Sequence, residues 1–289
     1  MSFLLVNPRS GDEQPTAEDL ARAAKTSGIE LHVLEPDDDA AELARAAVER
    51  GAETIGMAGG DGSLAPVAAL ALEKDVPFVP IPFGTRNHFA RDLGFDGDDP
   101  IGSLAAFQGP ERRVDAGSVS GRTFLNNVSL GLYASFVHDP TRKTRNRLLA
   151  FARMAPAALG RSRKPLAFSL EVNGRREQHS ALIAMVANNR YEMTSPAELG
   201  ERERLDEGLL HAYVIGAVGR GALLSLLAKA AVGNVQKAHG WVEHSAPRLR
   251  VEAGHPRLHA AVDGEPAMLE PPLEFEIRPR ALRVRTPGS

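Results

Sequence analysis

The sequence predicts an α/β domain with a doubly wound parallel sheet, followed by a β-rich second domain. In the first part of the chain, short apolar runs alternate with segments of helical periodicity, which is typical of βαβ units. After about Asp115, turn dipeptides separate the apolar runs, which favours antiparallel strands. We therefore expect domains at residues 1–116 and 117–289, with the last strand a candidate to return to the first domain.

The first domain is predicted to contain four strands joined by helices. The strands are expected at Phe3–Val6, Ile29–Leu34, Thr54–Ala58 and Phe78–Ile81. Thr16 with Asp19 resembles a capping box, and Asp39 can cap the alanine-rich run Ala40–Arg50. Ligands of parallel sheets bind beyond the carboxyl ends of the strands, so the loops after these runs are the expected site.

The second domain is predicted from its turns and closing strands. Turns are expected at Gly121-Arg122, Asn173-Gly174 and Asp263-Gly264, and strands at Leu166–Val172, Ala181–Val186, Leu273–Ile277 and Ala281–Arg285. Two helical stretches, Thr141–Leu159 and Gly221–Lys237, interrupt this pattern.

Composition excludes several classes of protein. The 289 residues carry a formal net charge of −3, without the basic excess of a nucleic-acid binder, so we expect no nucleic-acid partner. The chain has no cysteine, which excludes disulfides, thiolate metal sites and cysteine nucleophiles. No leader pattern or spanning apolar run is present, which favours a cytoplasmic location with at most peripheral contact at the inner membrane face. A monomer or homodimer is expected.

A glycine-rich turn lies between the third predicted strand and the helical segment Ala65–Leu72. It consists of Gly59-Gly60-Asp61-Gly62-Ser63. Glycines let the backbone approach a phosphate closely, and the start of a helix favours an anion. The Asp61 carboxylate suits a magnesium-bound water. The alternative is a purely structural turn.

A second glycine turn, Pro82 to Gly94, follows the fourth predicted strand. Gly84 and the Thr85 hydroxyl are candidates for contact with phosphate or metal-bound water. Arg86 can neutralise phosphate oxygens, and Asn87 can fix a neighbouring loop. Neither Walker A nor GxGxxG is present, which disfavours P-loop NTPases and dinucleotide dehydrogenases.

Six motifs in order resemble the signature of the diacylglycerol, sphingosine and bacterial lipid kinases. They are Val6–Gly11, Gly59–Ser63, Pro82–Gly94, Phe124–Gly131, Leu205–Leu210 and Val262–Glu265. The resemblance covers nearly the whole chain. It implies a fold like that of NAD kinase and diacylglycerol kinase, in which an α/β nucleotide-binding domain precedes a β-sandwich domain and the active site lies between them.

The resemblance also implies ATP and Mg²⁺ as cofactors and a lipid as substrate. The predicted nucleotide-site residues are Asn7, Gly59, Gly60, Asp61, Gly62, Ser63, Gly84, Thr85, Arg86 and Asn87. One departure is that Arg86 and His88 stand where the family usually has glycine and aspartate. Because of this departure, the alternative remains that the chain is a non-catalytic homologue that binds nucleotide or lipid.

Two acidic motifs complete the predicted site. By resemblance, Asp263 is the general base and Glu265 supports it or the metal water, because phosphoryl transfer needs a group to accept the proton of the attacking hydroxyl. The alternative is a type I′ hairpin turn with solvated acids. Asp206 and Glu207 resemble a loop that binds a structural Mg²⁺, with a solvated acidic turn as the alternative.

Further alternatives concern the substrate and the remaining polar residues. A kinase of a soluble substrate, similar to NAD kinase, shares the Gly-Gly-Asp-Gly turn. A basic segment without acids, running from Arg142 to Lys164, can contact an anionic membrane surface or form a solvated helix face. The nine histidines show no metal-ligand spacing such as HExxH, and packing or surface roles are expected for them.

Overall fold

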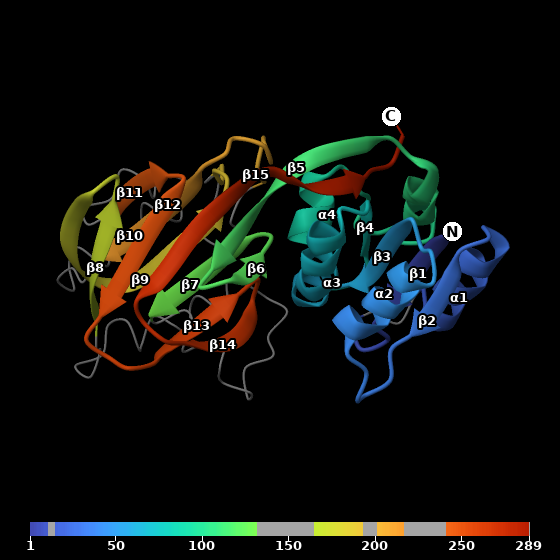
Figure 1. The fold of residues 1–289 in the computed structure, drawn as a ribbon, viewed down its shortest axis with the longest axis horizontal. Helices are drawn as coiled ribbons and strands as arrows, with labels where there is room; N and C mark the ends of the chain where they lie inside the picture. Colours follow the sequence, from blue (N-terminus) through green and yellow to red (C-terminus); the bar gives the residue numbers. More distant parts are fainter. Residues whose placement is uncertain (11–14, 132–164, 193–200, 217–240, 289) are drawn as a thin grey trace. The chain divides into compact units, whose positions relative to one another are not determined.

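The structure is a computed structural model that describes residues 1–10, 15–131, 165–192, 201–216 and 241–288 (Figure 1). The chain forms two compact units, Met1–Ala116 with Arg278–Ser289, and Gly117–Ile277. Both divisions fall inside strands, namely β5 (Glu111–Val119) and β15 (Leu273–Arg285). The predicted helical stretches at 141–159 and 221–237, and the basic segment at 142–164, lie outside the described residues.

The first unit is built on a parallel sheet. Its strands are β1 (Ser2–Val6), β2 (Glu30–Val33), β3 (Thr54–Gly59) and β4 (Phe78–Pro82). They lie in the order β2-β1-β3-β4 and are all parallel. The end of β15 adds to β4, with Val284 opposite Phe78. The predicted parallel α/β fold is therefore confirmed.

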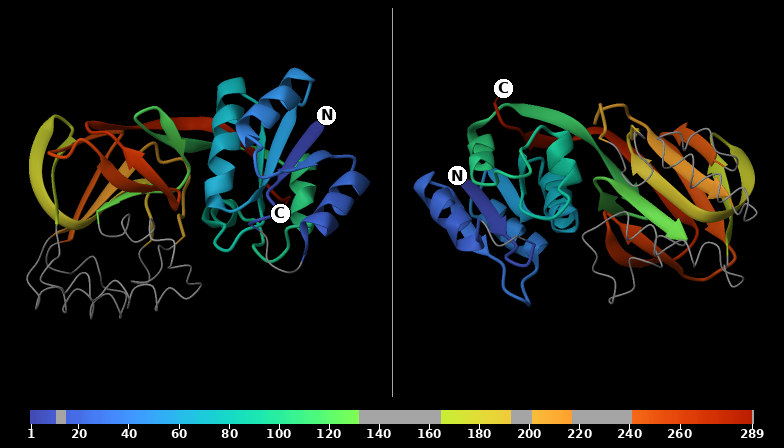
Figure 2. Two further views of the ribbon diagram at one scale, coloured as in Figure 1. Left: turned by 90° about the horizontal axis from the view of Figure 1, so that it is seen from below. Right: turned by 180° about the vertical axis from the view of Figure 1, so that it is seen from behind.

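Helices cover both faces of this sheet (Figure 2). They are α1 (Ala17–Thr26), α2 (Ala40–Glu49), α3 (Asp61–Lys74), the short α4 (His88–Asp92) and the 3₁₀ helix η1 (Gly102–Gln108). The capping box of Thr16 and Asp19 is present, and the Asp39 carboxylate accepts the amides of Ala41 and Glu42. Both predicted helix starts are confirmed.

Helix α3 begins earlier than predicted, at Asp61 instead of Ala65. Gly60 precedes it in an extended conformation (φ −77°, ψ 172°), as the N-cap residue of a helix does. The carboxylate in the first turn is compatible with the helix dipole. The glycine-rich motif is thus partly the first turn of the helix, and not only a loop before it.

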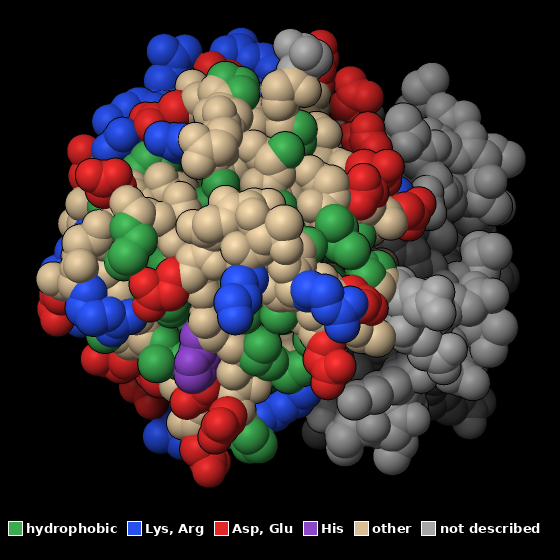
Figure 3. All heavy atoms as spheres, turned by 90° about the vertical axis from the view of Figure 1, so that its right-hand side faces the viewer, with side chains coloured by type: hydrophobic (Ala, Val, Ile, Leu, Met, Phe, Trp, Pro, Cys, Tyr) green, Lys and Arg blue, Asp and Glu red, His purple; other side chains and the backbone are tan. Residues whose placement is uncertain are grey.

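Acidic and basic side chains are interspersed on the face of the molecule drawn in Figure 3. Charged side chains also pair between neighbouring helices: Arg45 of α2 donates from Nη1 to Glu73 Oε1 of α3 at 2.8 Å and from Nη2 to Oε2 at 3.0 Å. This pairing holds the pKa of Glu73 at about 2.

The second unit is a β-rich, sandwich-like domain of antiparallel strands. Besides the ends of β5 and β15, it contains β6 (Arg122–Phe124), β7 (Asn127–Gly131), β8 (Leu166–Val172), β9 (Arg175–Asn188), β10 (Leu210–Gly216), β11 (Trp241–Ala246), β12 (Arg248–Ala253), β13 (Leu258–Val262) and β14 (Glu265–Leu269). The strand order is β14-β13-β7-β9-β8-β12-β15, and β10 pairs with both β9 and β11. Its core includes Phe124, Phe168 and Phe275, all buried.

Three two-residue turns join strands of this domain. They are Ser120-Gly121, Asn173-Gly174 and Asp263-Gly264, and both residues of each have positive φ, as type I′ turns require. The first lies one residue earlier than the predicted Gly121-Arg122, because Arg122 already pairs with Val119. The other two are where the sequence placed them.

Two strands are longer than predicted. β9 runs from Arg175 to Asn188, because its first half pairs with β8 and its second half with β7 and β10. The two closing strands are one continuous strand, β15. Among the described residues, no helix combines the length and the apolar character that crossing a bilayer requires.

Candidate functional site

The two glycine turns of the first unit touch each other. They follow the neighbouring parallel strands β3 and β4, whose carboxyl ends lie at the same edge of the sheet. A Cβ atom built on Gly84 would lie 2.5 Å from Gly60 Cα and 2.8 Å from Gly60 N. Backbone atoms cannot move aside as a flexible side chain does. Glycine is therefore required at position 84 for the two turns to pack this closely.

The amino end of α3 has no side-chain cap. Gly60, its N-cap residue, has no side chain that could accept the first amides. Next to it, Asn7 Nδ2 donates to Ser63 Oγ at 2.9 Å, which joins the end of β1 to the first turn of α3. The uncapped start of a helix, with glycine beside it, is a favourable place for an anion such as a phosphate.

Asp61 links the two turns. It is only 8% exposed, and its Oδ1 accepts the amide of Phe89 at 3.0 Å while its Oδ2 accepts the amide of His88 at 3.2 Å. These amides form the start of α4. The carboxylate thus caps the start of α4 in the second turn. The sequence predicted only a contact with magnesium-bound water for Asp61 and not this capping role.

Asn87 fixes the shape of the second turn from within. It is 3% exposed and has φ 51°, a left-handed conformation that asparagine tolerates. Its Oδ1 accepts the Gly84 amide at 2.9 Å, and its Nδ2 donates to the Gly84 carbonyl at 2.7 Å. Thr85 and Arg86, at the tip of the turn, are exposed to solvent. These bonds hold the turn of Asn87 itself, and its predicted roles in fixing a neighbouring loop and in the nucleotide site stay predictions.

In the second unit, the Asp263 carboxylate is fixed by three backbone amides. Oδ1 accepts from Asn126 at 2.7 Å and from Asn127 at 3.1 Å, and Oδ2 accepts from Leu125 at 2.8 Å. Asp263 is 7% exposed. The type I′ hairpin turn that was the alternative prediction is therefore present, but the Asp263 carboxylate in it is buried and not solvated. Glu265, two residues later on β14, is exposed.

A buried arginine that the sequence did not indicate supports the same segment. Arg202 is 3% exposed, donates from Nη1 to the Leu125 carbonyl at 2.7 Å, and donates from Nη2 to Asn126 Oδ1 at 2.7 Å. Asn188 also donates to the Leu125 carbonyl, at 2.9 Å. In the sequence, Arg202 lies between glutamates and looks like part of a solvated charged run. Only the long-range contacts reveal it.

The acidic pair Asp206 and Glu207 has partners from nearby loops. Asp206 Oδ1 accepts from Arg204 at 3.0 and 3.1 Å. Glu207 Oε2 accepts the Arg190 amide at 3.1 Å and lies 3.2 Å from His211 Nε2. The two carboxylates are thus bound to different groups, and the predicted Mg²⁺ site stays a prediction.

Comparison with known proteins identifies both halves of the chain. Residues 1–119 match the family described as "Diacylglycerol kinase catalytic domain", and residues 127–286 match "YegS C-terminal NAD kinase beta sandwich-like domain". A protein of Pseudomonas fluorescens, described as "Probable lipid kinase YegS-like", is 30% identical over 99% of this chain and 94% of its own length. A protein of Pseudomonas aeruginosa with the same description is 30% identical, with the same coverage of both chains.

Solved structures show the same fold. The crystal structure of a diacylglycerol kinase from Bacillus anthracis matches with a TM-score of 0.68 and 17% sequence identity, over 99% of this chain and 96% of that one. The matches to both families and the relatives at 30% identity agree with the six motifs found in the sequence. This chain therefore belongs to the YegS-like lipid kinase family, with a diacylglycerol kinase catalytic domain followed by a YegS C-terminal domain.

Proposed function

We propose that this chain is a lipid kinase that uses ATP and Mg²⁺ to phosphorylate a lipid hydroxyl, with a diacylglycerol-like lipid as the first candidate. The observation that supports this best is the close packing of Gly60 against Gly84 beside the uncapped start of α3. Its relatives are described as probable lipid kinases. The part of the chain that matches the diacylglycerol kinase catalytic domain contains these turns.

The first unit would bind the nucleotide. Its glycine turns leave room for phosphate oxygens near backbone amides, and the dipole of α3 favours their negative charge. Asn7 and Ser63 are joined side chain to side chain at this edge of the sheet. Arg86 is exposed at the tip of the second turn, from which a guanidinium can pair with phosphate. Asp61 would act by holding the second turn in place.

The second unit would supply the base. The hydroxyl oxygen of the lipid attacks the γ-phosphorus, the bond from that phosphorus to the β–γ bridging oxygen breaks, and ADP leaves. Asp263 accepts the hydroxyl proton, and the exposed Glu265 assists it. Three amides hold the Asp263 carboxylate in one orientation, and such fixed geometry favours catalysis.

Magnesium, when bound, neutralises the charge that develops on the transferred phosphate. Each oxygen of Asp61 accepts an amide, and because a carboxylate oxygen has two lone pairs, it could also accept a hydrogen bond from magnesium-bound water. Asp206 and Glu207 remain the candidates for a separate structural Mg²⁺. Titration of Asp206→Ala and the parent with Mg²⁺ by calorimetry tests that assignment, and equal binding would refute it.

The test of the activity is transfer of label from [γ-³²P]ATP to lipid. The purified protein is incubated with Mg²⁺ and vesicles containing one hydroxyl-bearing lipid at a time, diacylglycerol first, and the organic phase is counted. A parallel reaction contains NAD in place of lipid. Label in the organic phase that requires Mg²⁺ is the expected result.

Two variants sharpen this test. Asp263→Asn should lose at least 100-fold of the transfer rate while it retains ATP binding, since removal of a general base costs about 10²–10⁴-fold. Glu49→Gln, at an exposed position of α2, should behave like the parent. Label on NAD would favour the kinase of a soluble substrate. ATP binding without transfer to any acceptor would favour the non-catalytic homologue.

A further inference from the structure

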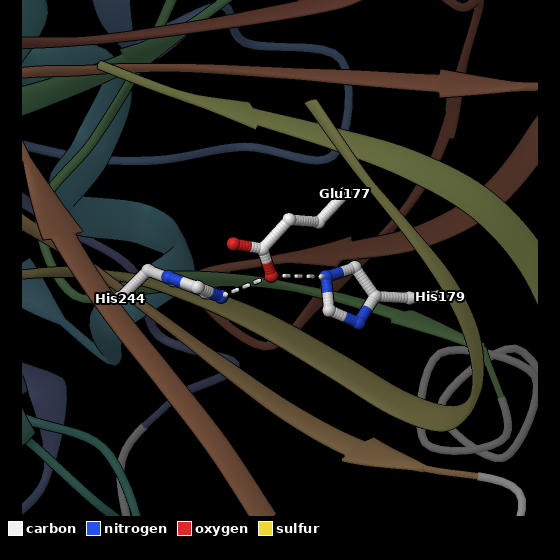
Figure 4. Close-up of side chains that lie close together, drawn as sticks. All are labelled: Glu177, His179 and His244. Atoms are coloured by element: carbon white, nitrogen blue, oxygen red, sulfur yellow. Dashed lines mark ion pairs between the residues drawn. The ribbon is translucent and has the colours of Figure 1, made fainter. Parts of the chain in front are cut away.

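Three side chains outside the proposed kinase site converge in the second unit. Glu177 and His179 lie two residues apart on β9 and therefore project from the same face of that strand. His244 comes from β11, which pairs with β10 and not directly with β9. Figure 4 shows both imidazole rings turned toward the Glu177 carboxylate. The strand pairing thus brings together residues that are far apart in the sequence.

The distances between these side chains are close to, and partly longer than, those between the ligands of a metal ion. Glu177 Oε2 lies 3.4 Å from His244 Nε2 and 3.7 Å from His179 Nε2, and the three ligand atoms all lie within 4.8 Å of one another. Ligand atoms bound at about 2.0–2.2 Å to a tetrahedral zinc are about 3.3–3.6 Å apart. Small side-chain rotations would therefore bring the three atoms to bonding distance.

The two histidines also have nitrogen atoms that lack a hydrogen bond. Nε2 of His179 and Nε2 of His244 are buried, and within the described parts of the chain neither has a hydrogen-bond partner. A buried polar atom without a partner destabilises the folded state, so such atoms call for an explanation.

We propose that Glu177, His179 and His244 bind one divalent transition-metal ion, Zn²⁺ in the first instance. Two imidazoles and one carboxylate are ligands that zinc uses in proteins, with a fourth position left for water. Magnesium prefers oxygen ligands only, so this site would not be the one that serves ATP. The Glu177 side chain is half exposed, which gives the ion a route from solvent.

The ion would connect β11 to the hairpin of β8 and β9. His179 already packs against Phe168 of β8, with ring centroids 5.5 Å apart, and against His244, with centroids 6.1 Å apart. An ion that binds only the folded state stabilises that state, and the stabilisation grows with the logarithm of the ion concentration once this exceeds Kd. We therefore expect zinc to raise the thermal stability of the protein.

The experiment uses the full chain without a histidine tag, stripped of metal with a chelator. Zn²⁺ is titrated in competition with a chromophoric chelator, for the parent and for Glu177→Gln, His179→Gln and His244→Gln. The control is His255→Gln, an exposed histidine outside the cluster. The parent and the control should bind one Zn²⁺ per chain, and each cluster variant should bind at least 10-fold more weakly. Millimolar Mg²⁺ should not compete.

Equal zinc affinity of the parent and His244→Gln would overturn the proposal, as would failure of the parent to bind. Circular dichroism shows whether each variant folds. A measurement on the parent alone guards against variants that do not fold: a crystal soaked with Zn²⁺ is measured at the zinc absorption edge. An anomalous peak beside Nε2 of both histidines supports the site. A peak only elsewhere identifies an adventitious ion and refutes it.

Discussion

At the scale of single residues, the buried carboxylate of Asp263 does two things in the proposed kinase. It would accept a proton, and it holds Leu125, Asn126 and Asn127 through their amides. An asparagine side chain has one acceptor oxygen and places an NH₂ group where the aspartate has its second oxygen. Loss of activity in Asp263→Asn therefore has a structural component, which the sequence alone did not predict.

Asp263→Asn should lower the free energy of unfolding by about 1–3 kcal/mol, the cost of leaving a buried partner unsatisfied. Urea unfolding of the parent and the variant measures this difference. The control is Glu265→Gln, which changes an exposed acid of the same motif and should leave stability within about 0.5 kcal/mol of the parent. Unchanged stability of Asp263→Asn would mean that the three amide bonds do not hold the loop.

Residues with local signals could be predicted, and residues with distant partners could not. Thr16 and Asp39 indicated where their helices begin, because the side chain of a capping residue bonds to amides only two or three residues away. Arg202 and His244 have no such signal. Their partners are far from them in sequence, and only the folded chain brings them together.

At the scale of elements, the contact between the two glycine turns can be tested without touching a charged group. A methyl group at position 84 would overlap the backbone of Gly60 and push the turns apart. Gly84→Ala should therefore weaken ATP binding at least 10-fold, as measured by calorimetry. Gly254→Ala, where a Cβ would have no atom within 4 Å, is the matched control. Parent-like ATP affinity in Gly84→Ala would contradict the assignment of these turns to the phosphates.

The pairing of β5 with β15 gives a pH-dependent contribution to stability. Arg283 of β15 donates to both oxygens of Glu111 on β5, at 2.7 and 2.9 Å, and these bonds lower the pKa of Glu111 from its ordinary value of 4.5. A carboxyl whose pKa is lowered by folding stabilises the protein above its unfolded pKa. That contribution is lost as the pH falls through the folded value.

Glu111→Gln should accordingly destabilise the protein at pH 7 by about 0.5–1 kcal/mol, a small effect because the pair is about one-third exposed. The difference from the parent should shrink as the pH falls from 5 to 3. Urea unfolding at several pH values measures it, with Glu49→Gln as the control. A difference that stays constant over this range would show that the ion pair is not its cause.

Two element boundaries that the sequence missed have different physical reasons. The motif Gly59–Ser63 was expected to be a loop, but Gly60 can adopt the N-cap conformation and the helix starts directly after it. The closing strands were separated at Arg278-Pro279-Arg280, yet β15 continues through these residues because its two ends pair with different strands. Local composition does not encode such pairing.

At the scale of the whole molecule, the order of six motifs predicted the family, and the comparisons confirm it. Each motif alone is compatible with an ordinary turn. Their joint order is more specific, because the motifs are spread over both units: the glycine turns belong to one unit and Asp263 to the other. The identity of the lipid is not encoded in this order, since acyl-chain selectivity depends on the shape of a binding surface.

The glycine turns proposed to bind the phosphates and the proposed zinc site should act independently, because they share no residue and lie in different units. The glycine turns belong to Met1–Ala116, and the zinc ligands belong to Gly117–Ile277. Gly84→Ala should weaken ATP binding and leave zinc affinity within 2-fold of the parent. His244→Gln should weaken zinc binding and leave ATP affinity within 2-fold of the parent. In the double variant, both losses should add in free energy, as they do for sites without common partners. Calorimetric titration of each ligand into all four proteins measures this. A zinc affinity that falls with Gly84→Ala would show coupling between the units, which no described contact of His179 or His244 provides.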